Sequence, residues 1–263
     1  MPSAATLRRQ IELALEARFP AALSPSPITI REVAATGIEE VDRHLDGGLP
    51  VGAISEIVGP ASSGRTTLAL AFLAQRTAES RFCAWVDAND TLDPESAAAS
   101  GVQLQQLLWV RCADAASDRK RTGGRVTAGD AKPWTRLDQA LRATDLLLQA
   151  GGFAAIVLDL GEMATEHGCR IPLATWFRFR QAAGRTRASL LVLGCATYAQ
   201  SSAAVVLECS PLRAQSAGGA VLSGFTFALR RERQRSSAGI ASQRKPPASS
   251  WSAHPAWQTE KRA

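Results

Sequence analysis

The sequence lacks the features that mark membrane-spanning, exported or disulfide-linked proteins. No stretch approaches the roughly 18 consecutive apolar residues of a transmembrane helix. Residues 1–10 hold no apolar segment of the kind that a secretory signal needs. The five cysteines are scattered, odd in number and never arranged as C-x-x-C. We therefore expect buried, reduced thiols in a cytoplasmic protein, with nucleoid association as a further option, and neither a membrane contact nor a cysteine-bound metal.

Acidic residues are scarce at the C-terminal end of the chain. The net charge is +6, and from residue 230 onward eight basic residues stand against only Glu232 and Glu260, so residues 1–229 are neutral overall. The eight are Arg230, Arg231, Arg233, Arg235, Arg244, Lys245, Lys261 and Arg262. This asymmetry favours an arm, centred on residues 230–235, that binds nucleic acid or an acidic partner, with a merely solubilising tail as the alternative.

Residues 233–263 also lack the apolar content of a core, because Ser, Ala, Pro and basic residues dominate from position 236 onward. The segment is predicted to be a disordered basic tail. Trp251 and Trp257 are unusual in such a segment and are candidate anchors for a partner, since tryptophan and arginine dominate interface hot spots. The alternative is that the two rings pack on the surface of the protein's own domain.

Between its two ends the chain alternates short apolar runs with helical patterns. Strands are predicted at 54–58, 82–87, 107–112, 153–159, 189–195, 205–209 and 224–230. Helices are predicted at about 38–45 with Thr36 as the cap, 65–79, 94–100, 136–150 and 171–183, and 113–135 is predicted to be a long loop. The alternation predicts an α/β fold with a mostly parallel, twisted sheet flanked by helices, in which 224–230 forms an antiparallel edge.

The first 30 residues are predicted to form an N-terminal helix and linker, ahead of a core at 31–232 and the tail at 233–263. Leu7, Ile11, Leu15 and Phe19 recur every four residues, and Pro20 ends the pattern. A short isolated helix is marginal in water, so this apolar stripe must dock on its own domain or on a neighbouring subunit.

A phosphate-loop pattern with one departure lies between the predicted strand 54–58 and the predicted helix 65–79. In G-x-x-x-x-G-K-[ST], backbone N–H groups cradle phosphates, the lysine reaches the β/γ-phosphates and the hydroxyl binds Mg²⁺. Arg65 stands at the lysine position. The candidate nucleotide-binding residues are Gly59, Ser63, Gly64, Arg65, Thr66, Thr67 and Asp159. Asp159 ends a buried-strand pattern, the form of the Mg²⁺-binding Walker B motif, so Thr66 and Asp159 are the candidate metal ligands for an ATP–Mg²⁺ complex.

Several stretches together resemble the bacterial RecA recombinase family. They are residues 36–52 before the loop, the loop segment 56–70, and Val86-Asp87-Ala88-Asn89-Asp90-Thr91-Leu92-Asp93-Pro94, followed in register by 101–108. The likeness spans about 36–230 and is most specific over 36–108. It implies a RecA-like P-loop NTPase core.

Departures from the family pattern imply a loss of ATP hydrolysis. Arg65 keeps the charge of the Walker A lysine in a bulkier, differently aimed group. Asn89 falls where the family carries the glutamate that activates water, and an amide cannot accept a proton. The adjacent Asp90 is expected to point elsewhere. The family's two DNA-contacting loops correspond to residues 161–168 and 196–202. Both segments are short, the first is acidic, and neither contains the Lys or Arg residues that supply most nucleic-acid affinity.

A core of this length with degenerate nucleotide motifs and a basic tail resembles the ImuA group. That likeness implies an accessory role in damage-induced translesion DNA synthesis, with an ImuB-like Y-family polymerase homologue or RecA as partner. Phe19-Pro20-Ala21-Ala22 fits a phenylalanine-x-x-alanine docking pattern of related recombinases. Two alternatives stay open: a DNA-dependent ATPase with Asp87 or Asp90 as base, and a single-stranded DNA binder using residues 230–235 and 119–125.

Overall fold

The computed structural model describes residues 32–112, 135–161, 163, 165–217, 221–234 and 248–253. The predicted N-terminal helix with Phe19, the loop segment 113–134, Arg235 and Trp257 lie outside these ranges. Within the described ranges, no helix combines the length and the apolar character that a membrane crossing requires.

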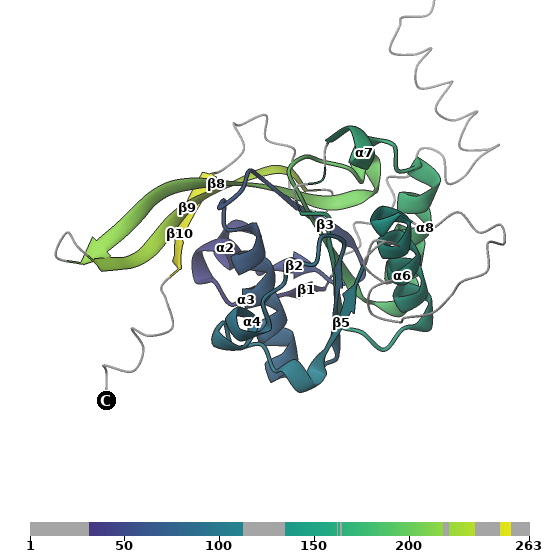
Figure 1. The fold of residues 1–263 in the computed structure, drawn as a ribbon, viewed down its shortest axis with the longest axis horizontal. Helices are drawn as coiled ribbons and strands as arrows, with labels where there is room; N and C mark the ends of the chain where they lie inside the picture. Colours follow the sequence, from purple (N-terminus) through teal and green to yellow (C-terminus); the bar gives the residue numbers. More distant parts are fainter. Residues whose placement is uncertain are drawn as a thin grey trace, which may run out of the picture. The chain divides into compact units, whose positions relative to one another are not determined.

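An eight-stranded sheet with the order β10-β9-β8-β3-β7-β6-β4-β5 forms the centre of the fold (Figure 1). Its strands are β3 (Ile54–Val58), β4 (Cys83–Asp87), β5 (Leu107–Arg111), β6 (Ala155–Asp159), β7 (Ser189–Gly194), β8 (Ala203–Ala217), β9 (Val221–Gln234) and β10 (Ala248–Ala253). Neighbouring strands from β8 to β5 pair in parallel, while β9 and β10 each pair antiparallel to their neighbour. The predicted mostly parallel sheet is confirmed.

Helices cover both faces of the sheet, because the central strands are apolar on both sides. In β6, Val157 belongs to the cluster under α3 (Arg65–Ala78) and α4 (Pro94–Ala99), whereas its neighbour Ile156 belongs to the cluster under α6 (Arg136–Ala150) and α8 (Leu173–Thr186). Successive side chains of a strand point to opposite faces, so a continuous apolar run is what a doubly covered sheet requires. Figure 1 shows α6 and α8 lying together and α3 beside α4.

A small second sheet leads into the core. It pairs β1 (Val33–Ala34) antiparallel with β2 (Leu49–Pro50), with α2 (Glu39–His44) between them, and the sequence patterns did not predict it. The predicted capping of α2 by Thr36 is wrong, because Ile38 is the N-cap and no side chain makes a capping hydrogen bond there. Thr36 instead braces the turn: its Oγ1 accepts from the Ile38 N–H (3.2 Å), and its own N–H donates to Asp42 (2.7 Å).

The predicted disorder of the tail is wrong over residues 248–253. These residues form β10, which pairs with β9 so that Trp251 lies opposite Phe227. The Trp251 side chain is 3% exposed, and its ring centroid lies 4.7 Å from that of Phe227. Trp251 is therefore part of the core and no exposed anchor, which agrees with the alternative of packing on the protein's own domain. β10 also takes the edge position that was predicted for β9.

Candidate nucleotide site

The phosphate loop joins β3 to α3, and two of its glycines are required by their surroundings. Gly64 is the N-cap of α3 with a φ of 87°, and a Cβ there would lie 2.9 Å from the ring of Phe227. At Gly59 a Cβ would collide with the carbonyl oxygen of Cys209 in β8. The loop therefore lies tightly against β8 and β9, with the N-terminus of a 14-residue helix aimed into it, an arrangement that favours anions.

A cavity of about 350 Å³ brings the predicted site residues Arg65, Thr66 and Asp159 together with Asn89. It is lined by Ala61, Ser62, Arg65, Thr66, Asn89, Thr91, Asp159, Gly161 and Leu193. A second cavity of about 280 Å³, between the loop and β9, is lined by residues 62–67 with Phe225 and Phe227. The two phenylalanines were missed, although the alternation predicted over 224–230 places both on one face of a strand.

Arg65 is largely buried, with 9% of its surface exposed. Its Nη1 donates a long hydrogen bond of 3.5 Å to the carbonyl oxygen of Gly161, in the loop after β6. A compact ammonium would act as a point charge on a phosphate, whereas this planar fork is directed toward a backbone oxygen on the far wall of the cavity.

Asp159 ends β6 and is 6% exposed. Burial raises the pKa of its carboxyl group, a hydrogen bond from the Gly161 N–H (2.8 Å) lowers it, the Asp87 charge raises it and the Arg65 charge lowers it, and the net result is a pKa of about 6. The carboxyl group is therefore largely ionised at neutral pH, as a metal ligand must be.

The loop residues fit a phosphate group with a divalent cation. Ser63 Oγ is buried and has no hydrogen-bond partner among the described residues, so it can donate to a ligand oxygen inside the loop. Thr66 and Asp159 line one cavity and offer oxygen ligands. No group of three or more His, Cys, Asp or Glu residues in the described part of the chain could hold a metal by itself, but Mg²⁺ commonly takes one or two protein ligands plus phosphate oxygens.

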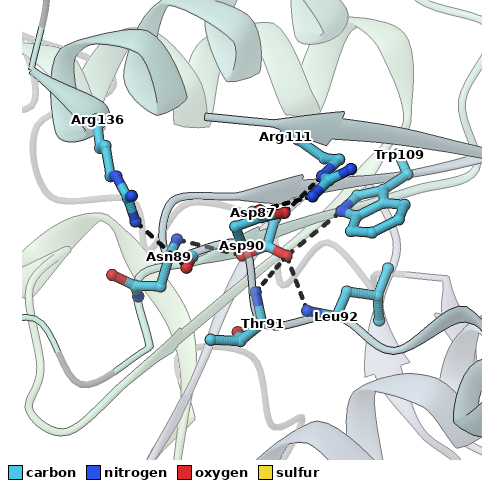
Figure 2. A network of polar contacts seen from close by, with 8 residues as sticks. All are labelled: Asp87, Asn89, Asp90, Thr91, Leu92, Trp109, Arg111 and Arg136. Atoms are coloured by element: carbon cyan, nitrogen blue, oxygen red, sulfur yellow. Dashed lines mark hydrogen bonds and ion pairs between the residues drawn. The ribbon is translucent and has the colours of Figure 1, made fainter. Parts of the chain in front are cut away.

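Asp87, at the end of β4, organises the loop that carries Asn89 (Figure 2). Its carboxylate is fully buried and accepts from the backbone N–H groups of Asn89 (3.2 Å), Thr91 (2.9 Å) and Leu92 (2.8 Å). Trp109 Nε1 donates a fourth hydrogen bond of 3.3 Å. With both oxygens occupied by these donors, Asp87 shapes the loop and is poorly placed to act as a base.

Asp90 points away from the phosphate loop, as predicted. Arg111 at the end of β5 grips its carboxylate with two hydrogen bonds, Nε to Oδ1 at 2.5 Å and Nη2 to Oδ2 at 2.7 Å (Figure 2). Arg136 Nη1 donates to the carbonyl oxygen of Asn89 at 3.3 Å. The Asn89 amide itself lies against Gly161, so tightly that a Cβ at that glycine would collide with it. Asn89 and Thr91 of this loop line the cavity with Arg65 and Asp159, whereas the carboxylates of Asp87 and Asp90 are bonded elsewhere.

The two segments that correspond to the family's DNA-contacting loops, 161–168 and 196–202, lie against the core wherever the structure describes them. Glu56 of β3 is fully buried, and its Oε1 accepts from the N–H groups of Tyr198 (2.6 Å) and Ala199 (2.8 Å). The Tyr198 ring is 2% exposed, with its hydroxyl 3.3 Å from Cys195 Sγ. A short helix, α7 (Thr165–Cys169), follows β6.

The predicted basic arm begins inside the sheet. Arg230 of β9 pairs with Glu208 of β8 through Nε (2.8 Å) and Nη2, and with Glu232 (2.9 Å). Arg231 Nη1 donates to the carbonyl oxygen of His44 (3.0 Å) and to Asp46 (3.2 Å), which ties β9 to the end of α2. The interpretation of residues 230–235 as an arm is corrected for these two arginines, because both hold elements of the core together. Arg233 lies in β9 opposite Val206.

Residues 24–118 match the RecA N-terminal domain family. RecA of Rhizobium rhizogenes is 39% identical over 129 residues, which cover 49% of this chain and 30% of that protein. RecA of Brucella anthropi is 37% identical over 135 residues, 51% of this chain and 31% of that protein. The crystal structure of the RadB recombinase superposes with a TM-score of 0.54 and 17% identity, over 79% of this chain and 93% of that chain. The fold is RecA-like.

The chain spans about a third of the length of the RecA proteins that it matches. The stretch that matches the family carries the phosphate loop and the Asp87–Asp90 loop, while Asp159 and strands β8 to β10 follow it. The match to the RecA N-terminal domain family therefore covers the part of the site that contains Arg65 and Asn89.

Proposed function

We propose that this protein is a RecA-fold accessory factor of the DNA damage response, which supports error-prone translesion synthesis through protein contacts and does not hydrolyse ATP. One observation carries the proposal. Asn89, which the RecA resemblance aligns with the catalytic glutamate, lines the cavity, while Asp87 is occupied by four donors and Asp90 by Arg111. An amide cannot serve as a general base, so this loop has lost that function.

ATP with Mg²⁺ is the ligand that the site supports best. Backbone N–H groups of the loop and the hydroxyl of Ser63 would hold phosphate oxygens, and Thr66 and Asp159 would hold the metal, which would neutralise phosphate charge. Arg65 would contribute positive charge from the Gly161 side of the cavity. On this proposal, nucleotide stabilises the fold and is not turned over.

The proposed partners are an ImuB-like Y-family polymerase homologue or RecA, reached through the N-terminal segment with Phe19 and the tail with Trp257, in the cytoplasm near the nucleoid. Support comes from the DNA-loop positions, which carry no Lys or Arg and whose described parts are tied to the core. Single-stranded DNA is the alternative partner.

Damage-induced mutation frequency tests the accessory role. A strain lacking the gene is expected to regain wild-type mutation frequency when it carries Arg65→Ala, because turnover is not needed, and to stay low with Phe19→Ala. Leu212→Ala, on an exposed site, is the control and should complement fully. Failure of Arg65→Ala at normal protein level would contradict the proposal.

A DNA-dependent ATPase is the second candidate, favoured by the cavity that places Thr66 and Asp159 together. The two bases predicted for it, Asp87 and Asp90, are both bonded elsewhere. This candidate therefore requires ATP turnover without either carboxylate, which the assay at the end of the Discussion measures.

A further inference from the structure

Residues 1–229 carry no net charge, but their acidic and basic residues are concentrated in different stretches. Residues 32–112 hold eleven acidic and five basic residues, whereas residues 167–207 hold five arginines and no acidic residue. The five all lie in or beside α8: Arg170, Arg178, Arg180, Arg185 and Arg187. The core therefore presents a basic helix of its own, independent of the C-terminal tail.

One side of α8 is committed to the core, and another is not. Trp176 and Phe179 are fully buried and form a T-shaped pair with centroids 5.9 Å apart. Leu173 and Phe177, one turn apart on a different side of the helix, are 55% and 50% exposed. Two half-exposed large apolar side chains at this spacing form a stripe rather than a scattered surface.

Arginines flank this stripe. The Arg180 guanidinium lies 5.5 Å from the ring centroid of Phe177, in cation–π contact. On the side toward α6, Arg178 pairs with Asp145 (3.0 Å), and Arg187 pairs with Glu32 at the C-terminal end. For Arg170, Arg180 and Arg185, the described part of the chain supplies no acidic partner within ion-pair distance.

We propose that this surface, the α8 face made by Leu173, Phe177, Arg180 and Arg185, docks an acidic amphipathic helix of a partner protein. Aromatic and arginine side chains together are typical of the energetic centre of an interface. Carboxylates of the partner would satisfy the arginines with charge-assisted hydrogen bonds, and its apolar side chains would cover Leu173 and Phe177. The inference goes beyond the proposed function, since it involves neither the N-terminal segment nor the tail and is independent of ATP turnover.

Leu173 and the shape of the surface favour a protein over a nucleic acid. Phosphates would pair with the arginines, and an unpaired base would stack on Phe177, but neither gives an aliphatic side chain an apolar counterpart. The face also belongs to a helix that lies on the protein, not to a groove that a strand of DNA could follow.

Fluorescence anisotropy with a designed probe tests the proposal. The probe is a fluorescein-labelled peptide of about 18 residues, long enough to form a helix, with Leu and Phe on one face and Glu on the other. The full-length protein should bind it, and both Leu173→Ala/Phe177→Ala and Arg180→Glu/Arg185→Glu should weaken binding about tenfold or more. Leu212→Ala/Arg213→Glu, an exposed apolar–basic pair on β8, is the matched control and should stay within about twofold of wild type.

Three results would overturn the proposal. One is equal binding of a peptide with the same composition but a scrambled, non-amphipathic order. Another is that an oligo-dT of similar length binds more tightly than the peptide, loses its affinity in the Arg180→Glu/Arg185→Glu variant and keeps it in the Leu173→Ala/Phe177→Ala variant. That result would assign the face to nucleic acid. The last is self-association in sedimentation that both α8 variants abolish while the peptide fails to bind. Circular dichroism of every variant should match wild type, so that a loss of binding reports on the surface.

Discussion

At the scale of single residues, the site is shaped by what each carboxylate is bonded to. Asp159 of β6 and Arg111 of β5 lie on either side of Asp87 in strand register. This register brings the two aspartates together, and it places Arg111 where it grips Asp90. The sequence leaves Asp87 or Asp90 as the base of the alternative ATPase and predicts only that Asp90 points elsewhere, and the pairing of strands shows what each carboxylate is bonded to.

Removing the Asp87 carboxylate should destabilise the protein strongly. Asp87→Ala leaves three backbone N–H groups and the Trp109 indole without their acceptor, and buried unpaired donors cost about 1–3 kcal/mol each. We expect a loss of more than about 3 kcal/mol in urea unfolding. Asp93→Ala, which removes the exposed N-cap of α4, is the control and should cost about 1 kcal/mol. Similar losses for both variants would show that Asp87 does not organise its loop.

The ionisation of Asp159 should make stability depend on pH. Its pKa is about 6 in the folded protein against an ordinary value of 3.8, so the folded state binds the proton more tightly. The cost of ionising it is absent below about pH 4, grows through pH 4–6 and is complete above that range. Asp159→Asn should therefore be more stable than wild type at pH 7–8 by about 2–3 kcal/mol, and equal to it near pH 4. Unfolding measured in EDTA checks this, and a difference that does not vary with pH would exclude it.

At the scale of elements, sequence patterns predict strands and helices where each element supplies its own apolar residues. The apolar runs ending at Asp87 and Asp159 gave β4 and β6 within two residues. β10 was missed for a physical reason: it has one large apolar residue, Trp251, and is held by pairing with an existing strand. No local pattern reveals that a polar segment will find such an edge.

The burial of Trp251 gives a prediction for this element. Trp251→Ala removes a ring packed at 4.7 Å from Phe227, beside the phosphate loop, and should destabilise the protein by about 3–5 kcal/mol. Leu212→Ala, at a 58% exposed position of β8, should change stability by less than about 0.5 kcal/mol. Chemical unfolding followed by circular dichroism measures both. A Trp251→Ala variant as stable as wild type would mean that β10 does not add to the core.

At the scale of the whole molecule, the C-terminal segment and the core cannot be separated by a simple deletion. A deletion of residues 231–263 would remove the end of β9 and all of β10, so any loss of DNA binding would report on folding. The net charge of residues 1–229 is also misleading. It sums to zero, but this sum conceals an acidic N-terminal half of the core and a basic α8.

Point variants provide the sharper test of DNA binding by β9. Because Arg230 and Arg231 are engaged by Glu208, Glu232, Asp46 and a backbone carbonyl, Arg230→Ala/Arg231→Ala should leave oligo-dT affinity within about twofold of wild type. Arg213→Ala is the control for a single exposed charge on the neighbouring strand. A clear loss of affinity together with a shallower salt dependence would restore the interpretation of these arginines as a nucleic-acid contact.

The central claim is a RecA-like fold that has kept its phosphate loop and lost its catalytic base. Phosphate release from ATP, measured with and without single-stranded DNA, tests it most directly. Wild-type protein should release no more phosphate than Arg65→Ala or Asp159→Ala, while Asn89→Glu in an Arg65→Lys background shows whether restoring both groups revives turnover. Turnover by the wild type that single-stranded DNA stimulates, and that Arg65→Ala abolishes, would contradict the account.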